Sequence, residues 1–229
     1  MNYKGIILDL DDTLYDYQSA HRIAMDITCK AIENELGLAA EQVQESFMQA
    51  RNQIHTELDM TASSHNRLLY FQRMYEILGI HPVQYALDSY ERYWSTLLDQ
   101  MRLNEGVPEF LQSIQDRKVC ILTDLTAHIQ HRKILRLNLG EHVDCLVTSE
   151  EAGREKPHPY MFMLALQKMK LQASEVCMIG DSFKKDMLGA HRLDIQAYWY
   201  NPDAKAQQLP QGIVSFTSFH DLLQMEMKK

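Results

Sequence analysis

The sequence has no excess of positive charge. Its 23 Lys and Arg residues are outnumbered by 31 Asp and Glu residues, giving a formal net charge of -8. Proteins that bind nucleic acids or anionic membrane surfaces carry dense basic patches, and none dominates here. The pair Arg132-Lys133 is interpreted as part of a solvated helix face. The predicted partner is therefore neither a nucleic acid nor a membrane.

Cysteine is scarce, and long apolar runs are absent. No two cysteines have CxxC or zinc-type spacing, which favours reduced and buried thiols. No apolar stretch approaches about 18 residues, so no membrane-spanning helix is expected. No signal peptide is expected either, because the first residues lead directly into an apolar run. These features predict a cytoplasmic protein. The cysteines are Cys29, Cys120, Cys145 and Cys177.

Short apolar runs alternate with segments of helical periodicity over most of the chain. This alternation predicts βαβ units, a parallel sheet and helices on both of its faces. The fold class is therefore α/β, with a three-layer, Rossmann-like core. The expected strands are 4–10, 119–122, 143–148, 176–179, 195–199 and 213–216. The expected core helices are 110–114, 127–137, 159–170 and 187–190.

One long stretch interrupts this alternation directly after the first expected strand. Its apolar residues recur with the period of a helix throughout, and no strand pattern appears. We therefore predict an all-helical inserted domain over residues 17–102, and an α/β core built from residues 1–16 and 103–229. The expected helices of the insert are 19–36, 41–58, 67–78 and 82–98.

Polar and acidic residues follow several of the expected strands. The apolar run Ile6-Ile7-Leu8 ends at Asp9 and Asp11, and burying these carboxylates unpaired would cost several kcal/mol. Two later strands end at Thr123-Asp124 and at Gly180-Asp181. The carboxyl ends of parallel strands lie along one edge of a sheet, where open α/β folds bind ligands. These residues are therefore expected to converge.

Four patches of the sequence resemble, in order and spacing, the motifs of the haloacid dehalogenase-like hydrolases. The position of the helical insert is similar to that of the family's cap. The resemblance covers the α/β part of the chain, and four ordered motifs are far more specific than any one of them. The matching patches are Asp9-Leu10-Asp11-Asp12-Thr13, Thr123, Lys156 in Arg154-Glu155-Lys156-Pro157, and Gly180-Asp181-Ser182 with Asp186.

The resemblance implies a Mg²⁺-dependent phosphatase, and the residue chemistry agrees with it. Asp9 is assigned as the nucleophile that forms an aspartyl-phosphate, and Asp11 as the acid and base. Asp181 joins these two residues as the metal ligands, because Mg²⁺ prefers carboxylate oxygens. Thr123 and Lys156 also act in catalysis. Thr123, Asp124 and Lys156 are assigned to the substrate phosphate, and Asp186 to orienting Lys156 or a metal-bound water.

Two residues depart from the family pattern. Asp124 and Lys185 stand where asparagine is frequent among the relatives, and both can alter substrate preference or rate. The predicted substrate is a small phosphorylated metabolite of the nucleotide or sugar phosphate type, bound by a monomer or homodimer. A phosphomutase or a haloacid dehalogenase on the same scaffold remains an alternative, as does a non-catalytic binding module.

Overall fold

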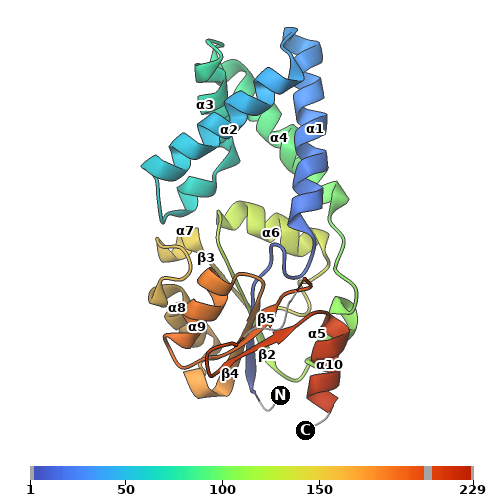
Figure 1. The fold of residues 1–229 in the computed structure, drawn as a ribbon, viewed down its shortest axis with the longest axis vertical. Helices are drawn as coiled ribbons and strands as arrows, with labels where there is room; N and C mark the ends of the chain where they lie inside the picture. Colours follow the sequence, from blue (N-terminus) through green and yellow to red (C-terminus); the bar gives the residue numbers. More distant parts are fainter. Residues whose placement is uncertain (1–2, 204–207, 228–229) are drawn as a thin grey trace. The chain divides into compact units, whose positions relative to one another are not determined.

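The computed structural model describes residues 3–203 and 208–227. The chain forms two compact units, which we call the core unit, Met1–Asp16 with Arg102–Lys229, and the helical unit, Tyr17–Met101. Figure 1 colours both along the sequence. The division expected from the sequence differs at one residue, since Arg102 belongs to the core unit.

The core unit is built on a six-stranded sheet with the order β3-β2-β1-β4-β5-β6, in which all neighbouring strands are parallel. The central strand β1 is buried along its whole length, as its sequence Gly-Ile-Ile-Leu requires. The strands are β1 (Gly5–Leu8), β2 (Lys118–Thr123), β3 (Cys145–Thr148), β4 (Val176–Gly180), β5 (Gln196–Tyr200) and β6 (Ile213–Phe216).

The order of the strands reverses at β1. From β1 the chain first adds β2 and β3 on one side, and then adds β4, β5 and β6 on the other. In open parallel sheets such a switch point opens a crevice at the carboxyl ends of the two central strands, and ligands bind there. The residues that follow β1 and β4 therefore stand at the expected ligand-binding edge.

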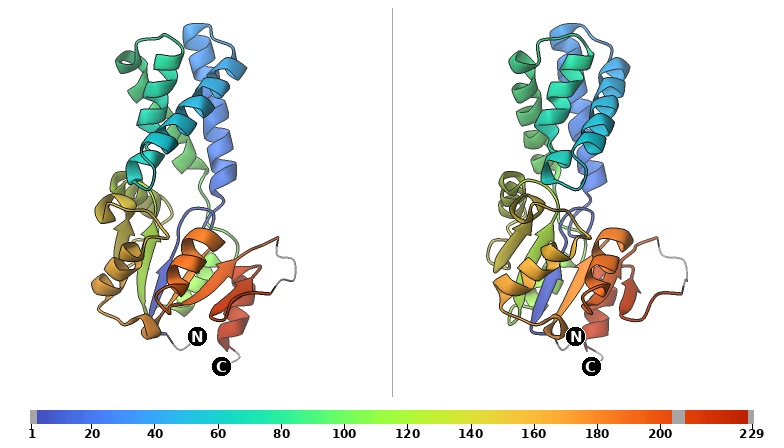
Figure 2. Two further views of the ribbon diagram at one scale, coloured as in Figure 1. Left: turned by 60° about the vertical axis from the view of Figure 1, so that its left-hand side comes forward. Right: turned by 90° about the vertical axis from the view of Figure 1, so that its left-hand side faces the viewer.

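Helices cover both faces of the sheet, as the views in Figure 2 show. On one face α8 packs against β2 and β3, and α9 packs against β5. Elsewhere in the unit α10 packs against α5 and β6. The predicted α/β class with a parallel sheet is confirmed. The helices are α5 (Val107–Ser113), α6 (Ala127–Arg136), α7 (Ser149–Ala152), α8 (Pro159–Met169), α9 (Leu188–His191) and α10 (Phe219–Met227), with short turns η2 (Ala173–Glu175) and η3 (Phe183–Met187).

The helical unit contains helices only among its described elements. Its interior is aromatic, with Phe47 packed against Phe71 and Phe71 against Tyr93. The first helix ends before Gly37, whose positive φ of 67° suits glycine at a helix end. The elements are α1 (Tyr17–Leu36), α2 (Ala40–Glu57), η1 (Ala62–His65), α3 (Arg67–Ile77) and α4 (Pro82–Gln100).

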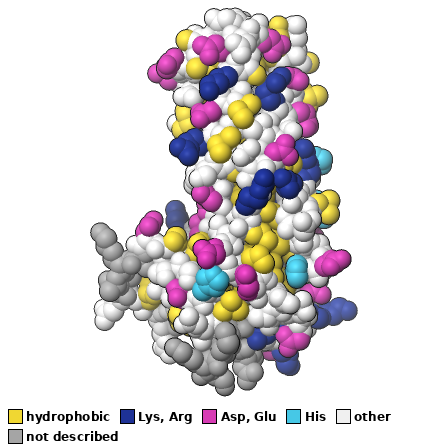
Figure 3. Space-filling view, turned by 90° about the vertical axis from the view of Figure 1, so that its right-hand side faces the viewer, with side chains coloured by type: hydrophobic (Ala, Val, Ile, Leu, Met, Phe, Trp, Pro, Cys, Tyr) yellow, Lys and Arg dark blue, Asp and Glu magenta, His cyan; other side chains and the backbone are white. Residues whose placement is uncertain are grey.

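The surface charges and the cysteines of the structure match what the sequence led us to expect. On the face drawn in Figure 3, acidic and basic side chains are interspersed rather than gathered by sign. All four cysteines are free thiols, three of them buried and Cys145 half-buried. Among the described residues, no helix is long and apolar enough to cross a bilayer.

Candidate active site

Lys156 joins two carboxylates at the carboxyl edge of the sheet. Its ammonium group donates to Asp9 Oδ1 at 2.5 Å and to Asp186 Oδ1 at 2.7 Å. Only 3% of Lys156 and 5% of Asp9 is exposed. Burial lowers the pKa of Lys156, but Asp186 and Asp9 outweigh burial and hold the pKa well above its ordinary value. Lys156 is therefore a fixed positive charge beside the proposed nucleophile.

Three carboxylates share this site. One oxygen from each of Asp9, Asp181 and Asp186 lies within 4.8 Å of the other two. Burial, followed by repulsion from Asp9 and Asp186, raises the pKa of Asp181 to about 8. Burial and Asp9 likewise raise the pKa of Asp186 to about 7, although Lys156 opposes this. One lysine does not balance three clustered carboxylates, so the donor set suits a hard divalent cation.

Thr13 connects the ends of the two central strands. Its hydroxyl donates to Asp9 Oδ2 at 2.9 Å and accepts from the backbone N–H of Asp181 at 3.0 Å. This residue is fully buried. The last position of the DxDxT pattern therefore orients the carboxylate of Asp9 and fixes β1 against the loop after β4.

Asp186 is held in place by the turn that follows β4. The turn η3 is a single π-helical turn, a form often found at functional sites. Ser182 caps it by accepting from the backbone N–H of Lys185, as expected for a helix start. The backbone N–H of Ser182 donates to Asp186 Oδ2 at 3.0 Å. Asp186, fixed by this bond, accepts a hydrogen bond from Lys156 Nζ, and its assigned role of orienting Lys156 stays a prediction.

Asp11 points to a different set of partners. Its carboxylate accepts from Lys133 Nζ at 2.7 and 2.8 Å, from Gln130 Nε2 at 3.2 Å and from the Tyr15 hydroxyl. Burial raises the pKa of Asp11, but Lys133, Tyr15 and Gln130 together bring it below its ordinary value. The carboxylate of Asp11 is thus held as an anion, two residues from Asp9.

The interpretation of Arg132-Lys133 as a solvated helix face was wrong for Lys133. Only 1% of Lys133 is exposed, because its side chain is drawn inward by the Asp11 carboxylate. Gln130, which is also fully buried, donates to Thr123 Oγ1 at 2.6 Å as well as to Asp11. Gln130 and Lys133 stand three residues apart on α6, so they lie on the same face of that helix. This spacing was the one feature of the sequence that could have indicated a shared role.

Asp124 and Lys185, the two residues that depart from the family pattern, form an ion pair with each other. Lys185 Nζ lies 2.7 Å from Asp124 Oδ2 and 3.5 Å from Glu155 Oε2. The other carboxylate oxygen of Asp124 accepts from the backbone N–H of Lys156 at 3.0 Å. Burial lowers the pKa of Lys185, and Asp124 more than offsets this. The side chain of Asp124 therefore anchors the loop that carries Lys156.

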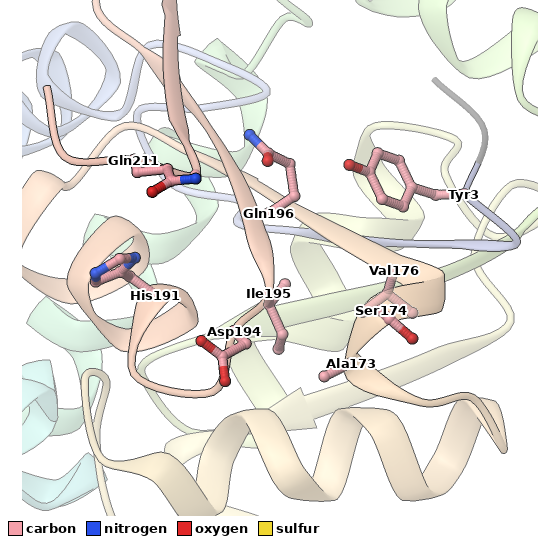
Figure 4. Close-up of a pocket in the computed structure, with 10 residues that line it drawn as sticks. Tyr3, Ala173, Ser174, Val176, His191, Asp194, Ile195, Gln196 and Gln211 are labelled. Carbon is pink, nitrogen blue, oxygen red and sulfur yellow. The ribbon is translucent and has the colours of Figure 1, made fainter.

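A separate pocket lies at the opposite edge of the sheet. It has a volume of about 480 Å³ and is lined by residues at the starts of β4 and β5, including Val176 and Gln196. Figure 4 shows Tyr3, Gln196 and Gln211 around it. None of the motif residues lines this pocket, so it is not part of the carboxylate site.

Comparison with known proteins identifies the family. The family model described as haloacid dehalogenase-like hydrolase matches residues 3–194, and the chain belongs to this family. The match covers both the carboxylate cluster and the helical unit.

Two similar proteins are named as phosphatases. The chain is 34% identical to the ribulose-1,5-bisphosphate 5-phosphatase of Halopiger xanaduensis over 207 residues, covering 88% of this chain and 86% of that one. It is 27% identical to the glyceraldehyde 3-phosphate phosphatase of Methanocaldococcus jannaschii, covering 83% of this chain and 81% of that one. The chain is accordingly a phosphoric monoester hydrolase of the family.

The fold recurs in solved structures of low sequence identity. A 2-haloacid dehalogenase of Pseudomonas syringae aligns with a TM-score of 0.78 and 22% identity, covering 99% of both chains. At this identity the likeness concerns the fold alone.

Proposed function

We propose that the chain is a Mg²⁺-dependent phosphatase that hydrolyses a small phosphorylated metabolite through an aspartyl-phosphate on Asp9. The observation that carries the proposal is the pairing of buried Asp9 with Lys156 inside a cluster of three carboxylates. A nucleophile needs a fixed orientation and a compensating charge, and both are provided there.

In the first half-reaction a carboxylate oxygen of Asp9 attacks the phosphorus atom. The new Asp9–phosphorus bond forms as the bond from phosphorus to the ester oxygen breaks. Asp11, which is held as an anion by Lys133, Tyr15 and Gln130, must first take up a proton from solvent, and it then gives this proton to the departing oxygen. Lys156 offsets the charge of Asp9 and the phosphoryl group, and the Thr123 hydroxyl binds a phosphoryl oxygen.

In the second half-reaction water attacks the phosphorus of the phosphorylated Asp9. Asp11, now ionised, takes a proton from that water, and the bond between Asp9 and phosphorus breaks. Free phosphate leaves and the carboxylate of Asp9 is restored. The hydrogen bond from Thr13 keeps the other oxygen of Asp9 in place during both steps.

Asp9, Asp11 and Asp181 are the proposed metal ligands. The carboxylates of Asp9 and Asp181 belong to the cluster, whereas the carboxylate of Asp11 is occupied by Lys133, so Asp11 contributes its main-chain carbonyl. When bound, Mg²⁺ would neutralise these carboxylates and polarise the phosphoryl group.

The names of the relatives support a phosphorylated sugar or a nucleotide as the substrate class. They specify ribulose 1,5-bisphosphate, glyceraldehyde 3-phosphate and a pyrimidine 5'-nucleotidase activity. A haloacid dehalogenase would need neither an acid at Asp11 nor the carboxylate of Asp181. The four free thiols are consistent with a cytoplasmic location.

The test is phosphate release from a panel of sugar phosphates and nucleotides, with Mg²⁺ and with EDTA. We expect release with Mg²⁺ only, and a loss of about 10³-fold or more in kcat for Asp9→Asn. Full activity of Asp9→Asn would exclude the covalent route. Release of chloride from haloacids in the presence of EDTA would favour a haloacid dehalogenase. Conversion of a sugar phosphate into its isomer without release of phosphate would favour a phosphomutase.

A further inference from the structure

Two of the four thiols stand side by side in the sheet of the core unit. Cys120 of β2 and Cys145 of β3 are aligned partners in the parallel pairing of these strands. Aligned Cα atoms of neighbouring strands lie about 4.8 Å apart, within the range of about 4.4–6.8 Å found between the Cα atoms of a disulfide. The backbone therefore already holds the two cysteines at the separation that a disulfide requires.

Both side chains point to the face of the sheet that α8 covers. Cys120 is fully buried there in a cluster with Val147 and Met169, and Cys145 packs against the same cluster. The two thiols share a hydrogen bond, in which Cys120 donates to the sulfur of Cys145. The Cys120 sulfur also lies 3.6 Å from the main-chain oxygen of Ile121, which is a weak contact for an S–H group. The two sulfur atoms are therefore in direct contact.

Cys145 is the more accessible of the two cysteines. Its side chain is half-buried, whereas Cys120 is fully buried. Cys145 begins β3, which stands at one end of the strand order, so β2 is its one neighbour among the described strands. An edge strand can adjust its position more easily than a central one when a new bond forms. A small oxidant thus reaches Cys145 first and needs no access to Cys120.

The surroundings of Cys145 favour its thiolate form. The hydrogen bond from Cys120 and the charge of Lys168 lower the pKa of Cys145, although burial and Asp144 oppose them. The same hydrogen bond and burial raise the pKa of Cys120 well above its ordinary value. Lys168 is held beside β3, because its Nζ donates to the main-chain oxygen of Leu146 at 2.7 Å. A partly exposed thiolate next to a second thiol is the arrangement found at redox-sensing cysteines.

We propose that Cys120 and Cys145 form a redox-active thiol pair, in which a hydroperoxide oxidises Cys145 to a sulfenic acid that Cys120 then converts to a disulfide. In the first step the Cys145 sulfur attacks an oxygen of the hydroperoxide. A sulfur–oxygen bond forms, the oxygen–oxygen bond breaks, and the departing oxygen takes up a proton. The two electrons that leave the sulfur reduce the hydroperoxide.

In the second step the Cys120 sulfur attacks the Cys145 sulfur. The disulfide forms, the sulfur–oxygen bond breaks, and the departing hydroxyl leaves as water with the proton of Cys120. Two thiols of a reductant reverse the oxidation by exchange, and each cysteine regains its proton. Such reversible disulfides are the kind found in reducing compartments.

The test treats the folded protein with hydrogen peroxide, blocks the remaining thiols by alkylation and maps the peptides by mass spectrometry. Cleavage after Lys and Arg places each cysteine in a peptide of its own: 23–30, 119–132, 137–154 and 171–184. We expect the two middle peptides to be joined with the loss of two hydrogen atoms, and to separate again in dithiothreitol. The two outer peptides should carry alkylated, unoxidised thiols.

Single substitutions separate the roles of the two cysteines. In Cys145→Ser the joined peptides should disappear, and the loss of free thiol should slow by about 10-fold or more. In Cys120→Ala the sulfenic acid has no thiol to react with, so dimedone should label peptide 137–154. Cys29→Ser is the matched control, because burial raises the pKa of Cys29 to about 11. It should form the disulfide at the wild-type rate.

The peptide map of the wild type decides the inference even if Cys120→Ala does not fold. The inference is overturned if the folded wild type keeps all four thiols, or if the joined peptides contain Cys29 or Cys177. It is also overturned if Cys145→Ser loses its thiols as fast as the wild type. Phosphate release is not a readout, so the result is independent of the proposed phosphatase activity.

Discussion

At the scale of single residues, Asp11 differs from Asp9 in its partners. Asp9 faces Lys156, whereas Asp11 is held by Lys133, Gln130 and Tyr15. An acid that must protonate a leaving group benefits from a fixed position more than from charge alone. In the proposed mechanism Asp11 is the acid, and we propose that Lys133 positions it.

Replacing Lys133 tests this role through the leaving group. We expect Lys133→Met to lower kcat by about 10- to 100-fold for an alkyl phosphate, whose departing oxygen needs a proton. The loss should be much smaller for p-nitrophenyl phosphate, whose leaving group needs none. Arg136→Met, an exposed change on the same helix, is the control. An equal loss on both substrates would contradict positioning of the acid.

Asp124 and Lys185 form a pair that a double-mutant cycle can measure. Lys185 is 37% exposed and Asp124 is 13% exposed at the side chain, so solvent screens the pair. We expect a coupling of about 0.5–1 kcal/mol in unfolding free energy between Asp124→Asn and Lys185→Asn. Urea unfolding of the two single variants and the double variant gives this value. Strict additivity would mean that the pair has no energetic role.

The sequence predicted the residues whose positions follow from strand ends. Asp9, Thr123 and Asp181 come directly at or after parallel strands, so topology alone brings them to one edge. Lys133 could not be placed this way, because helical periodicity does not distinguish a solvated lysine from one drawn to a buried carboxylate. The pairing of Asp124 with Lys185 joins positions 61 apart, which local patterns do not report.

At the scale of elements, the junction of β4 with η3 depends on Gly180. A Cβ at this position would lie 2.4 Å from Asp186 Oδ2 and 2.6 Å from its carboxyl carbon. The glycine thus leaves room for the carboxylate that orients Lys156. This is a packing requirement of the active site, and no other residue type satisfies it without a shift of Asp186.

Gly180→Ala should therefore reduce both stability and activity. We expect a loss of about 1–3 kcal/mol in unfolding free energy, because the methyl group overpacks the junction. The kcat should fall as Asp186 moves away from Lys156. Gly140→Ala is the control, since a Cβ there meets nothing within 4 Å. Wild-type kcat in folded Gly180→Ala would show that the position of Asp186 is not critical.

Most elements were predicted, including the four-residue helix α9, whereas the helices α7 and α10 were missed. All six strands and the four long helices of the helical unit appear where the patterns indicated. The helix α7 spans only four residues, too few to show a period. The helix α10 follows the last predicted strand, and no helix was predicted over its residues.

At the scale of the whole molecule, His21 makes the stability of the helical unit depend on pH. Burial, Arg67 and Arg51 lower the pKa of His21 from 6.5 to about 4. Between these two values the unfolded chain binds more protons than the folded chain, so stability falls as the pH decreases from 6.5 toward 4. The loss is at most about 3.5 kcal/mol, at about 1.4 kcal/mol per pKa unit.

The chain offers a reporter for this effect, because Trp94 lies in the helical unit and Trp199 in the core unit. In a Trp199→Phe background, urea unfolding followed by Trp94 fluorescence should give a lower stability at pH 5 than at pH 7.5. His21→Gln should flatten this difference, and His128→Gln, an exposed change, should preserve it. An unchanged difference in His21→Gln would assign the pH dependence to other groups.

The position of β1 in the sheet has a consequence for biosynthesis. Gly5 of β1 aligns with Lys118 of β2 on one side and with Val176 of β4 on the other. The strand β1 is therefore synthesised before both of its neighbours, and it is fully paired only after β4 has been synthesised. The helical unit is one continuous segment, so all of it has left the ribosome before β2 is made. We expect the nascent chain to present a folded helical unit while β1 still lacks its neighbours. Asp9 meets Asp181 only after the residue 172 positions later has been synthesised, so premature termination upstream of Asp181 leaves the carboxylate cluster incomplete.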